Sequence, residues 1–380
     1  MRETTRVAII GAGPAGLTLA LLLRRNGIDC VVLERRARSY VEQRQRAGVL
    51  DHHATRIFEQ AGLADEILTG APAETLLELR YDGSPHFLDV PSLAGGRPSR
   101  SLPQQLLVRR LLAAAGDVRF EAREVALHDL TSSRPRVTYT DADGASHEIA
   151  CSYIAGCDGF HGVSRRSIPS AAVTTYEFDH GIGWLTLLAD APPPRYPLMA
   201  ISSHGYAAQF ARGPAASRFY LQFFADDPLA WPSSYVWDQL RLRLGDPSLP
   251  TGTITDREVV EMRSFVTEPM AYGRLHLAGD AAHIITPMGA KGMNLALSDA
   301  ATLAAALIDG SPGALEAYSS SCLARTWDAQ EFSRWFTEMV HDAGIADPFR
   351  RKLARARFER LFRSPPAAAA FADLMSGTDY

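Results

Sequence analysis

The ten residues VAIIGAGPAG, from Val7 to Gly16, decide the fold of this 380-residue chain. The first four are apolar without alternation, which predicts a short buried parallel strand. A helix should follow over about residues 14–26, because Gly27 suits the position just after a helix. The next apolar run, CVVLE at Cys30–Glu34, predicts a second buried strand. Together they form one right-handed βαβ unit, so the chain begins with an α/β fold.

The three glycines of this stretch have separate predicted roles. Gly11 permits a tight turn, Gly13 leaves room for a pyrophosphate, and Gly16 lets helix and strand pack closely. The phosphates would meet the unpaired amides at the positive end of the helix. Glu34 follows 23 residues after Gly11, where a carboxylate can accept both hydroxyls of an adenosine ribose. Glycine-rich turns also occur for structural reasons alone, but this context predicts a Rossmann-like dinucleotide-binding domain.

Composition limits the class of protein and its partners. A hydrophobic fraction of 46% and a charged fraction of 22% are those of a globular protein, and the net charge of −4 gives no reason to expect nucleic acid or an anionic membrane. The uncharged residues 7–23 are interrupted by glycines and a proline, so we predict neither a signal peptide nor a membrane span. The four cysteines include no CxxC pair. We therefore predict a reduced, cytoplasmic protein, and we find no ligand spacing that indicates a metal site.

Later segments predict a second sheet and a helical C-terminal region. Turns at Asp82–Gly83 and Asp143–Gly144 indicate hairpins, and alternation between residues 181 and 224 predicts a mostly antiparallel sheet. Helices are expected at 49–62, 104–115 and 292–308, a strand at 275–278, and a break at Pro365–Pro366. The predicted domains are a discontinuous dinucleotide-binding domain (1–73, 98–175 and 266–320), a β-sheet domain (74–97 and 176–265) and a helical region (321–380).

Two later motifs bear on which dinucleotide is bound. Cys157-Asp158-Gly159 follows an apolar strand, and Gly279-Asp280-Ala281-Ala282-His283 follows another and leads into a glycine-rich loop at 287–294. An Asp-Gly pair is usually a turn, and an aspartate after a strand is often only a helix cap. Asp280 could instead hold a ribityl hydroxyl, and the loop amides could approach an isoalloxazine ring. We expect His283 to pack and form hydrogen bonds behind this loop.

Together these motifs resemble the three fingerprints of the class A flavoprotein aromatic hydroxylases, and the similarity is closest to the 4-hydroxybenzoate 3-monooxygenase family. Further similar segments lie at 45–50, 153–162, 183–185, 263–265 and 289–292, and the resemblance runs from about residue 6 to about 340. It implies a GR2-type flavoprotein hydroxylase fold with an inserted antiparallel substrate domain and C-terminal helices. It also implies noncovalent FAD, NADPH as reductant, and O₂, with a flavin C4a-hydroperoxide attacking an aromatic ring. A homodimer is left open.

The resemblance assigns residues to two nucleotides. For FAD the positions are Gly11, Gly13, Ala15, Gly16, Glu34, Arg35, Arg46, Gln104, Asp158, Asp280, Pro287, Gly292, Met293 and Asn294. For NADPH, which would lie in a surface groove, they are Arg35, Arg36, Tyr40, Arg44, His161 and Arg263. The cluster Arg35–Arg36–Arg38 suits a 2′-phosphate, although a solvated positive face is an equal alternative.

The resemblance also implies a substrate site. Arg212 matches the arginine that binds the substrate carboxylate, Tyr220 a tyrosine that supports it, and Pro287 a further residue of the catalytic set. A desolvated arginine that forms a bidentate pair would orient the ring over the flavin.

The sequence departs from the family pattern at the substrate. The family's phenol-to-surface proton relay of two tyrosines and a histidine is matched here by Met199, Met375 and Glu74, and a carboxylate-binding serine by Phe210. Methionine cannot take up or transmit a proton. Nearby hydroxyl and imidazole groups could substitute if the chain shifts locally, namely those of Ser202, Ser203, His204 and Tyr206.

These departures predict an aromatic carboxylate other than simple 4-hydroxybenzoate, such as an amino- or differently hydroxylated benzoate. Three alternatives stay open: 4-hydroxybenzoate 3-monooxygenase itself, an FAD oxidoreductase without oxygen insertion, and a flavin- or nucleotide-binding regulator without catalysis.

Overall fold

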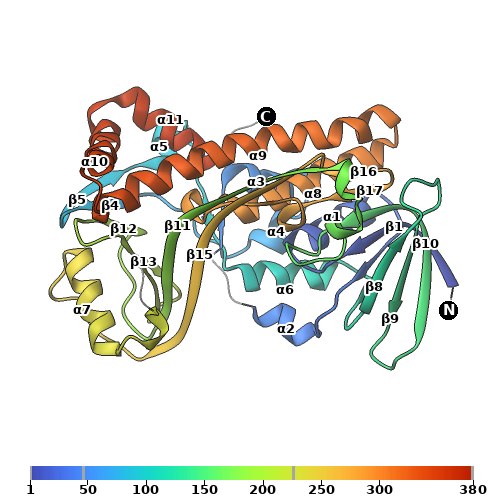
Figure 1. Cartoon of the computed structure of the whole chain (residues 1–380), viewed down its shortest axis with the longest axis horizontal. Helices are drawn as coiled ribbons and strands as arrows, with labels where there is room; N and C mark the ends of the chain where they lie inside the picture. Colours follow the sequence, from blue (N-terminus) through green and yellow to red (C-terminus); the bar gives the residue numbers. More distant parts are fainter. Residues whose placement is uncertain (1, 45–47, 225–226, 378–380) are drawn as a thin grey trace.

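The computed structural model describes residues 2–44, 48–224 and 227–377. Two large sheets form the two halves of the molecule (Figure 1). The long strands β11 (Thr174–Ala189) and β15 (Ile254–Glu268) run between the halves, and the long helix α9 (Pro312–His341) crosses both.

The first sheet is built on the predicted βαβ unit. Its central strand β1 (Arg2–Ile10) lies between β10 (Ser146–Gly156) and β2 (Cys30–Leu33), and all three are parallel. Parallel strands β7 (Val118–Arg119) and β17 (Leu275–Leu277) extend it on either side. Three strands add antiparallel pairs, namely β8 (Arg123–His128), β9 (Arg136–Thr140) and β16 (Ala271–Tyr272). The predicted strands and the hairpin at Asp143–Gly144 are confirmed.

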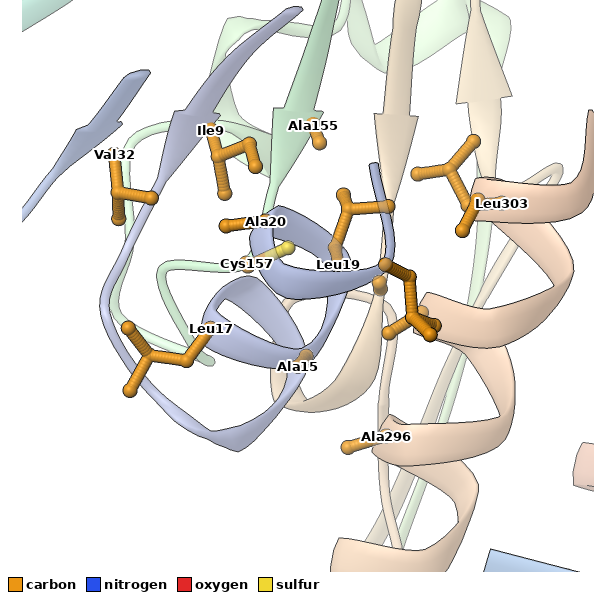
Figure 2. Packing of buried hydrophobic residues seen from close by; sticks show 14 of the residues in the cluster. Ile9, Ala15, Leu17, Leu19, Ala20, Val32, Ala155, Cys157, Ala296 and Leu303 are labelled. Carbon is orange, nitrogen blue, oxygen red and sulfur yellow. The ribbon is translucent and has the colours of Figure 1, made fainter. Parts of the chain in front are cut away.

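Helix α1 (Pro14–Arg25) packs between this sheet and α8 (Lys291–Asp309). Figure 2 shows Leu17 and Leu19 of α1 among buried side chains of the strands and of α8. Small residues such as Ala15 and Ala296 let the helices approach closely. The helix ends before Gly27, whose φ of +70° is left-handed, and this confirms the predicted boundary.

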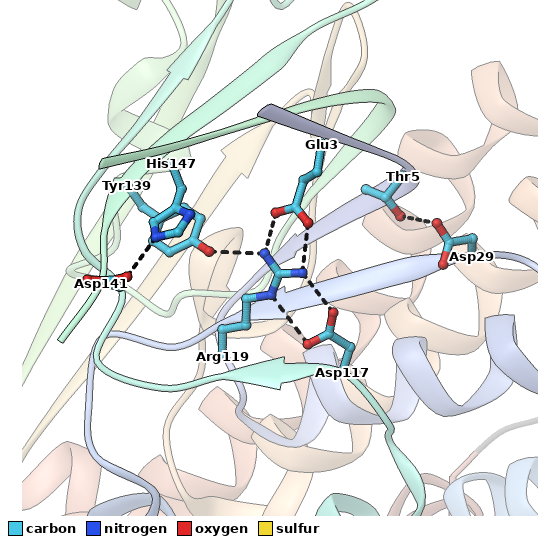
Figure 3. A network of polar contacts seen from close by, with 8 residues as sticks. All are labelled: Glu3, Thr5, Asp29, Asp117, Arg119, Tyr139, Asp141 and His147. Atoms are coloured by element: carbon cyan, nitrogen blue, oxygen red, sulfur yellow. Dashed lines mark hydrogen bonds and ion pairs between the residues drawn. The ribbon is translucent and has the colours of Figure 1, made fainter. Parts of the chain in front are cut away.

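A polar network holds the edge strand β7 in place (Figure 3). Arg119 donates to Glu3 of β1 (3.0 Å), Asp117 (2.9 Å) and the hydroxyl of Tyr139 of β9 (3.0 Å). These hydrogen bonds raise the pKa of Arg119, so its charge is permanent. They join strands of the parallel and antiparallel parts of the first sheet.

The second sheet has the order β18-β15-β11-β14-β13-β12-β4-β5. Its strands besides β11 and β15 are β4 (Leu77–Tyr81), β5 (Ser84–Leu88), β12 (Leu198–Ile201), β13 (Ala207–Ala211), β14 (Ser217–Phe223) and β18 (His283–Ile284). All neighbours pair antiparallel except β12 and β4, which are parallel. The predicted mostly antiparallel sheet and its hairpin at Asp82–Gly83 are therefore confirmed.

The two faces of the second sheet have different neighbours. On one face, Phe219 and Leu221 pack against Trp237 of α7 (Ser233–Leu244), a helix that the sequence pattern did not predict. On the other face, strand residues pack against Phe332 and Phe336 of α9. Side chains alternate between faces along a strand, so every second residue of β12, β13 and β14 faces α9.

One predicted helix boundary was wrong. Val49–Leu50 forms strand β3, which pairs with β6 (Arg100–Ser101), and helix α3 (His52–Gln60) begins only after Asp51 caps it. The partner strand lies about fifty residues away in the sequence, so local pattern could not show the pairing. The prolines at 365 and 366 lie in the first turn of α11 (Pro365–Ser376), after α10 (Pro348–Arg363). The division into domains stays a prediction.

The remaining helices are short, apart from α6. They are α2 (Arg38–Gln43), α4 (Ala64–Leu68), α5 (Val90–Leu93) and α6 (Gln104–Ala114), with 3₁₀ turns η1 (Arg165–Ser167), η2 (Ser170–Ala172), η3 (Pro228–Ala230), η4 (Gly279–Ala281), η5 (Met288–Ala290) and η6 (Asp342–Gly344). In the described ranges, no helix has the length and apolar character needed to cross a bilayer.

Candidate active site

The glycine turn after β1 has the shape of a pyrophosphate site. Gly11 has a φ of +106°, and an added Cβ would lie 2.4 Å from the carbonyl oxygen of Cys157. An added Cβ on Gly16 would lie 2.0 Å from the carbonyl oxygen of Gly11. At Gly13, in contrast, a Cβ would meet no described atom within 4 Å. Gly11 and Gly16 are therefore required by the fold, whereas Gly13 leaves open space before the unpaired first-turn amides of α1.

Glu34 is held at the same turn by two backbone amides. Its Oε2 accepts from the amide of Ala12 (2.9 Å) and its Oε1 from the amide of Arg36 (2.8 Å). The half-exposed carboxylate therefore has a fixed orientation just after β2, beside the open space at Gly13. This arrangement fits the ribose role predicted for Glu34.

Asp158 lies in a tight turn after β10. Its Oδ2 accepts from the amide of Ser164 (2.9 Å), and an added Cβ on Gly162 would lie 2.1 Å from its Cγ. Its buried Oδ1 has no hydrogen-bond partner among the described residues, and burial raises the pKa of this carboxyl. A buried acceptor without a partner is costly, so this oxygen is suited to accept from a bound ligand.

Asp280 is exposed in η4, against the first turn of α1 and against α8. An added Cβ on Gly279 would lie 3.5 Å from Cβ of Ala15 and 3.0 Å from Cβ of Ala296. The structure thus brings Asp280 to the end of the first sheet where the glycine turn lies.

His283 is buried behind this segment. Its Nε2 lies 2.7 Å from Oδ2 of the fully buried Asp299, which also accepts from the amide of Gly279 (2.9 Å). Burial lowers the pKa of His283, but Asp299 outweighs burial and the net shift is upward. The packing and hydrogen-bonding role predicted for His283 is confirmed. No metal-binding cluster of three or more His, Cys, Asp or Glu side chains occurs within the described residues.

The glycine-rich loop after Pro287 is anchored on two sides. Asn294 donates to the carbonyl of Val49 (3.1 Å) and accepts from the amide of Asp51 (3.2 Å). The hydroxyl of Thr286 lies 2.9 Å from that of Thr337 on α9. Gly289 (φ +77°) and Ala290 (φ +54°) turn the chain between these anchors, while Gly292 and Met293 remain half-buried. The loop is therefore rigidly placed between β3 and α9.

Two other predicted FAD contacts lie near the start of α6. Gln104 is the first residue of this helix and is half-buried. An added Cβ on Gly48 would lie 2.7 Å from the amide nitrogen of Gln104, so the chain just before β3 packs directly on it. Arg46 lies outside the described residues.

The residues predicted for NADPH form two groups on the surface. Arg35, Arg36, Tyr40 and Arg44 are exposed on and beside α2, with the Arg36 guanidinium 5.0 Å from the ring centroid of Tyr40. His161 is exposed, and Arg263 lies over the ring of its neighbour Phe160 at 4.1 Å.

The predicted substrate residues lie together on the face of the second sheet that turns toward α9. The ring of Tyr220 on β14 lies 4.9 Å from that of Trp184 and 5.7 Å from that of Phe210 on β13. Met199 on β12 and Met288 from the glycine-rich loop belong to the same buried apolar cluster, and Met375 of α11 packs against it. The structure therefore brings the substrate residues and the predicted flavin loop to one place.

Arg212 lies at the end of this row with Glu74 close to it. Burial lowers the pKa of the half-buried Arg212, an effect that the neighbouring Tyr220 partly offsets. Burial raises the pKa of Glu74 to about 7, although the charge of Arg212 acts in the opposite direction. An arginine and a carboxyl that titrates near neutrality thus stand at the edge of an aromatic pocket wall.

Sequence reasoning missed two pairs of buried groups. Lys291 and Asp51 form a buried ion pair (3.0 Å) between the flavin loop and the cap of α3, 240 residues apart in the sequence, and nothing local signals it. Arg218 is 7% exposed on the same face as Tyr220, 3.4 Å from the hydroxyl of Thr186. The i, i+2 spacing of Arg218 and Tyr220 on a strand could have revealed that they share a face.

Comparisons with known proteins agree with this geometry. A family model described as "FAD binding domain" matches residues 4–333. The chain is 38% identical to the p-hydroxybenzoate hydroxylase of Acinetobacter baylyi over 99% of this chain and 96% of that protein. It is 28% identical to a 3-(3-hydroxy-phenyl)propionate/3-hydroxycinnamic acid hydroxylase of Mycobacterium sp. strain KMS, over 94% of this chain but only 62% of that longer protein.

A solved structure shows the same fold over the whole chain. The p-nitrophenol 4-monooxygenase of Pseudomonas putida DLL-E4 superposes with a TM-score of 0.81 at 19% identity, covering 100% of both chains. The glycine turn, the fixed Glu34, the anchored loop and these matches lead to one conclusion: the chain belongs to the class A FAD-dependent aromatic hydroxylases and is a flavoprotein monooxygenase.

Proposed function

We propose that this enzyme hydroxylates a substituted aromatic carboxylate, using NADPH as reductant and O₂ as oxygen source. The observation that carries the proposal is the position of Arg212, half-buried at the end of an apolar and aromatic face that continues into the flavin loop through Met288. A guanidinium that has lost most of its water binds a carboxylate strongly and fixes its orientation. An aromatic acid held there would place its ring over the cluster of Met199, Phe210 and Tyr220.

The protein's contribution to the reaction is binding, orientation and exclusion of water. Bound FAD supplies the redox chemistry that activates oxygen. Gly13, Glu34 and the unpaired oxygen of Asp158 would hold its nucleotide and ribityl parts, while Pro287 and the loop through Asn294 would border its ring system. The apolar side chains around Tyr220 would keep water from the reacting ring.

Methionines at 199 and 375 argue against a substrate that must lose a phenolic proton. A thioether is at most a weak acceptor and carries no proton. An amino substituent activates a ring without deprotonation, so we infer an amino- or additionally hydroxylated benzoate as substrate. The second candidate, 4-hydroxybenzoate itself, is favoured by the 38% identity to p-hydroxybenzoate hydroxylase.

The decisive experiment compares substituted benzoates as stimulators of NADPH oxidation. Purified enzyme is incubated with NADPH and 4-aminobenzoate, 4-hydroxybenzoate or a dihydroxybenzoate, and NADPH loss, hydrogen peroxide and product mass are measured. We expect an amino- or extra hydroxyl-substituted acid to yield one added oxygen per NADPH, and plain 4-hydroxybenzoate to yield mostly peroxide. Tight coupling with 4-hydroxybenzoate would establish the second candidate instead.

Labelled oxygen separates this function from the other two readings. Incorporation of one ¹⁸O atom from ¹⁸O₂ into the product establishes a monooxygenase. Substrate turnover without incorporation identifies an oxidoreductase on the same scaffold, and binding of FAD without any turnover identifies a regulator.

Affinity for an aromatic carboxylate should fall as pH rises through about 7, the pKa of Glu74. An incoming carboxylate repels ionised Glu74 and takes up the charge of Arg212, so binding raises the pKa of Glu74 further and takes up a proton. We expect the dissociation constant of benzoate, measured by the change in flavin absorbance, to increase roughly tenfold between about pH 6 and pH 8.

The matched variant is Glu74→Gln, which keeps the shape of the side chain and removes its titration. Its benzoate affinity should be nearly constant over this range and should match or exceed that of the parent at low pH. An identical pH profile in the parent and in Glu74→Gln would assign the titration to another group.

Preference for NADPH over NADH should depend on Arg35 and Arg36. Both are exposed after β2, where guanidinium groups can bind a 2′-phosphate. In Arg35→Gln/Arg36→Gln, the ratio of kcat/KM for NADPH to that for NADH should fall about tenfold or more, mainly through KM, because charge-assisted hydrogen bonds are lost. The control Arg351→Gln/Lys352→Gln removes two exposed charges from α10 and should leave the ratio unchanged. If both double variants keep the parent ratio, the cluster is a solvated surface.

A further inference from the structure

Among the four residues considered as substitutes for the missing proton relay, only Tyr206 reaches the apolar cluster of the substrate face. Ser203 and His204 are exposed, and the hydroxyl of Ser202 donates to the carbonyl of Gly205 (2.9 Å). Tyr206 is 1% exposed and belongs to the same cluster as Met199 and Tyr220. No shift of the chain is needed to bring it there.

The register of the sheet places Tyr206 in line with the other substrate residues. Residues 206, 208, 210 and 212 alternate with those that face α7, so Tyr206, Ala208, Phe210 and Arg212 lie on one face. Ala208, the smallest of them, is paired with Met199 on β12 and with Tyr220 on β14. The row therefore has a cation at one end, small and apolar groups in the middle, and a phenol at the other end.

Aromatic neighbours hold the ring of Tyr206 in a single position. It stacks on Trp184 with centroids 5.3 Å apart and planes 15° apart, and it lies 4.7 Å from the ring of His341. Trp184 also contacts Tyr220, so one indole links Tyr206 to the residue that supports Arg212. A ring fixed in this way loses little conformational entropy when its hydroxyl binds a ligand.

The surroundings of Tyr206 keep it neutral and remove any proton-transfer partner in contact with its ring. Burial raises the pKa of Tyr206 well above its usual value. Its imidazole neighbour, His341, accepts from Nε1 of Trp184 at Nε2 (2.7 Å) and donates from Nδ1 to the carbonyl of Thr337 (2.8 Å). Burial lowers the pKa of His341 to about 3, so this imidazole is neutral and both its nitrogens are engaged.

We propose that Tyr206 is a specificity-determining residue, whose hydroxyl hydrogen-bonds to a neutral polar substituent on the ring of an aromatic carboxylate that Arg212 holds at the other end of the row. This inference rests on the proposed function and narrows its substrate class to benzoates whose substituent, an amino or an un-ionised hydroxyl group, keeps its protons. A phenol that must ionise finds no acceptor for its proton at Tyr206.

The test is Tyr206→Phe, which removes one oxygen atom and keeps the ring on Trp184. Dissociation constants for benzoate and for 4-aminobenzoate are measured from the change in flavin absorbance of the FAD-loaded enzyme. We expect 4-aminobenzoate to bind about 5- to 10-fold more weakly to the variant, the loss expected for one neutral hydrogen bond, and benzoate to bind equally to both proteins. The control Tyr235→Phe removes a phenol from α7, on the opposite side of the sheet, and should change neither constant.

Two outcomes overturn the inference. If Tyr206→Phe binds 4-aminobenzoate as tightly as the parent, the hydroxyl does not contact the substituent. If benzoate and 4-aminobenzoate weaken equally, Tyr206 has only a packing role. Both leave the proposed function intact, because the parent enzyme still binds aromatic carboxylates. Absence of benzoate binding to the parent would contradict the proposed function and, with it, this inference.

Discussion

Gly13→Val should yield a folded protein that is largely free of FAD. A Cβ at this position meets no described atom within 4 Å, and the φ of −82° is accessible to valine, so the chain itself tolerates the side chain. The branched side chain would instead fill the space that a pyrophosphate needs above the first turn of α1. The ratio of flavin to protein absorbance should fall to a small fraction of the parent value, with little change in the far-ultraviolet circular dichroism spectrum.

Two further glycine variants make this result specific. Gly313→Val also adds a side chain in open space near the start of a helix, α9, and should retain full FAD content. Gly16→Val should instead fail to fold stably, because its Cβ would lie 2.0 Å from the carbonyl oxygen of Gly11. Full FAD content in Gly13→Val would contradict the placement of the pyrophosphate.

Arg212→Ala should weaken the binding of an aromatic carboxylate by on the order of 2–5 kcal/mol, the range for removing one partner of a buried charge pair. The ligand carboxylate would lie at an apolar wall with no cation at the end of β13, and Glu74 beside it would add repulsion whenever it is ionised. The loss should appear in the dissociation constant of benzoate and in kcat/KM for the true substrate, with unchanged FAD content.

Arg212→Lys separates charge from geometry. A single ammonium keeps the charge but cannot form a bidentate pair, so this variant should bind better than Arg212→Ala and worse than the parent. Arg195→Ala removes an exposed arginine from the same β-rich half of the chain and should bind benzoate normally. Parent-like benzoate affinity in Arg212→Ala would mean that the carboxylate binds elsewhere.

The nucleotide half of the molecule could be predicted from the sequence because its signals are local. The run of apolar residues before Gly11, the helix that ends before Gly27 and the strand before Glu34 lie within thirty residues, and each was found where the pattern placed it. The roles of Gly11 and Gly16 depend on backbone contacts that a strand–turn–helix geometry imposes on any such sequence. The two hairpins were equally local.

The tertiary structure alone decided how distant segments combine at the substrate face. Pairing of Val49–Leu50 with Arg100–Ser101 turned the start of an expected helix into a strand, and the ion pair of Lys291 with Asp51 joins residues 240 positions apart. Strand register placed Tyr206 in the row of Arg212, and packing against Trp184 and His341 buried it there. A one-dimensional pattern states which residues alternate, but long-range pairing sets which faces meet, and burial then sets which groups keep their charge.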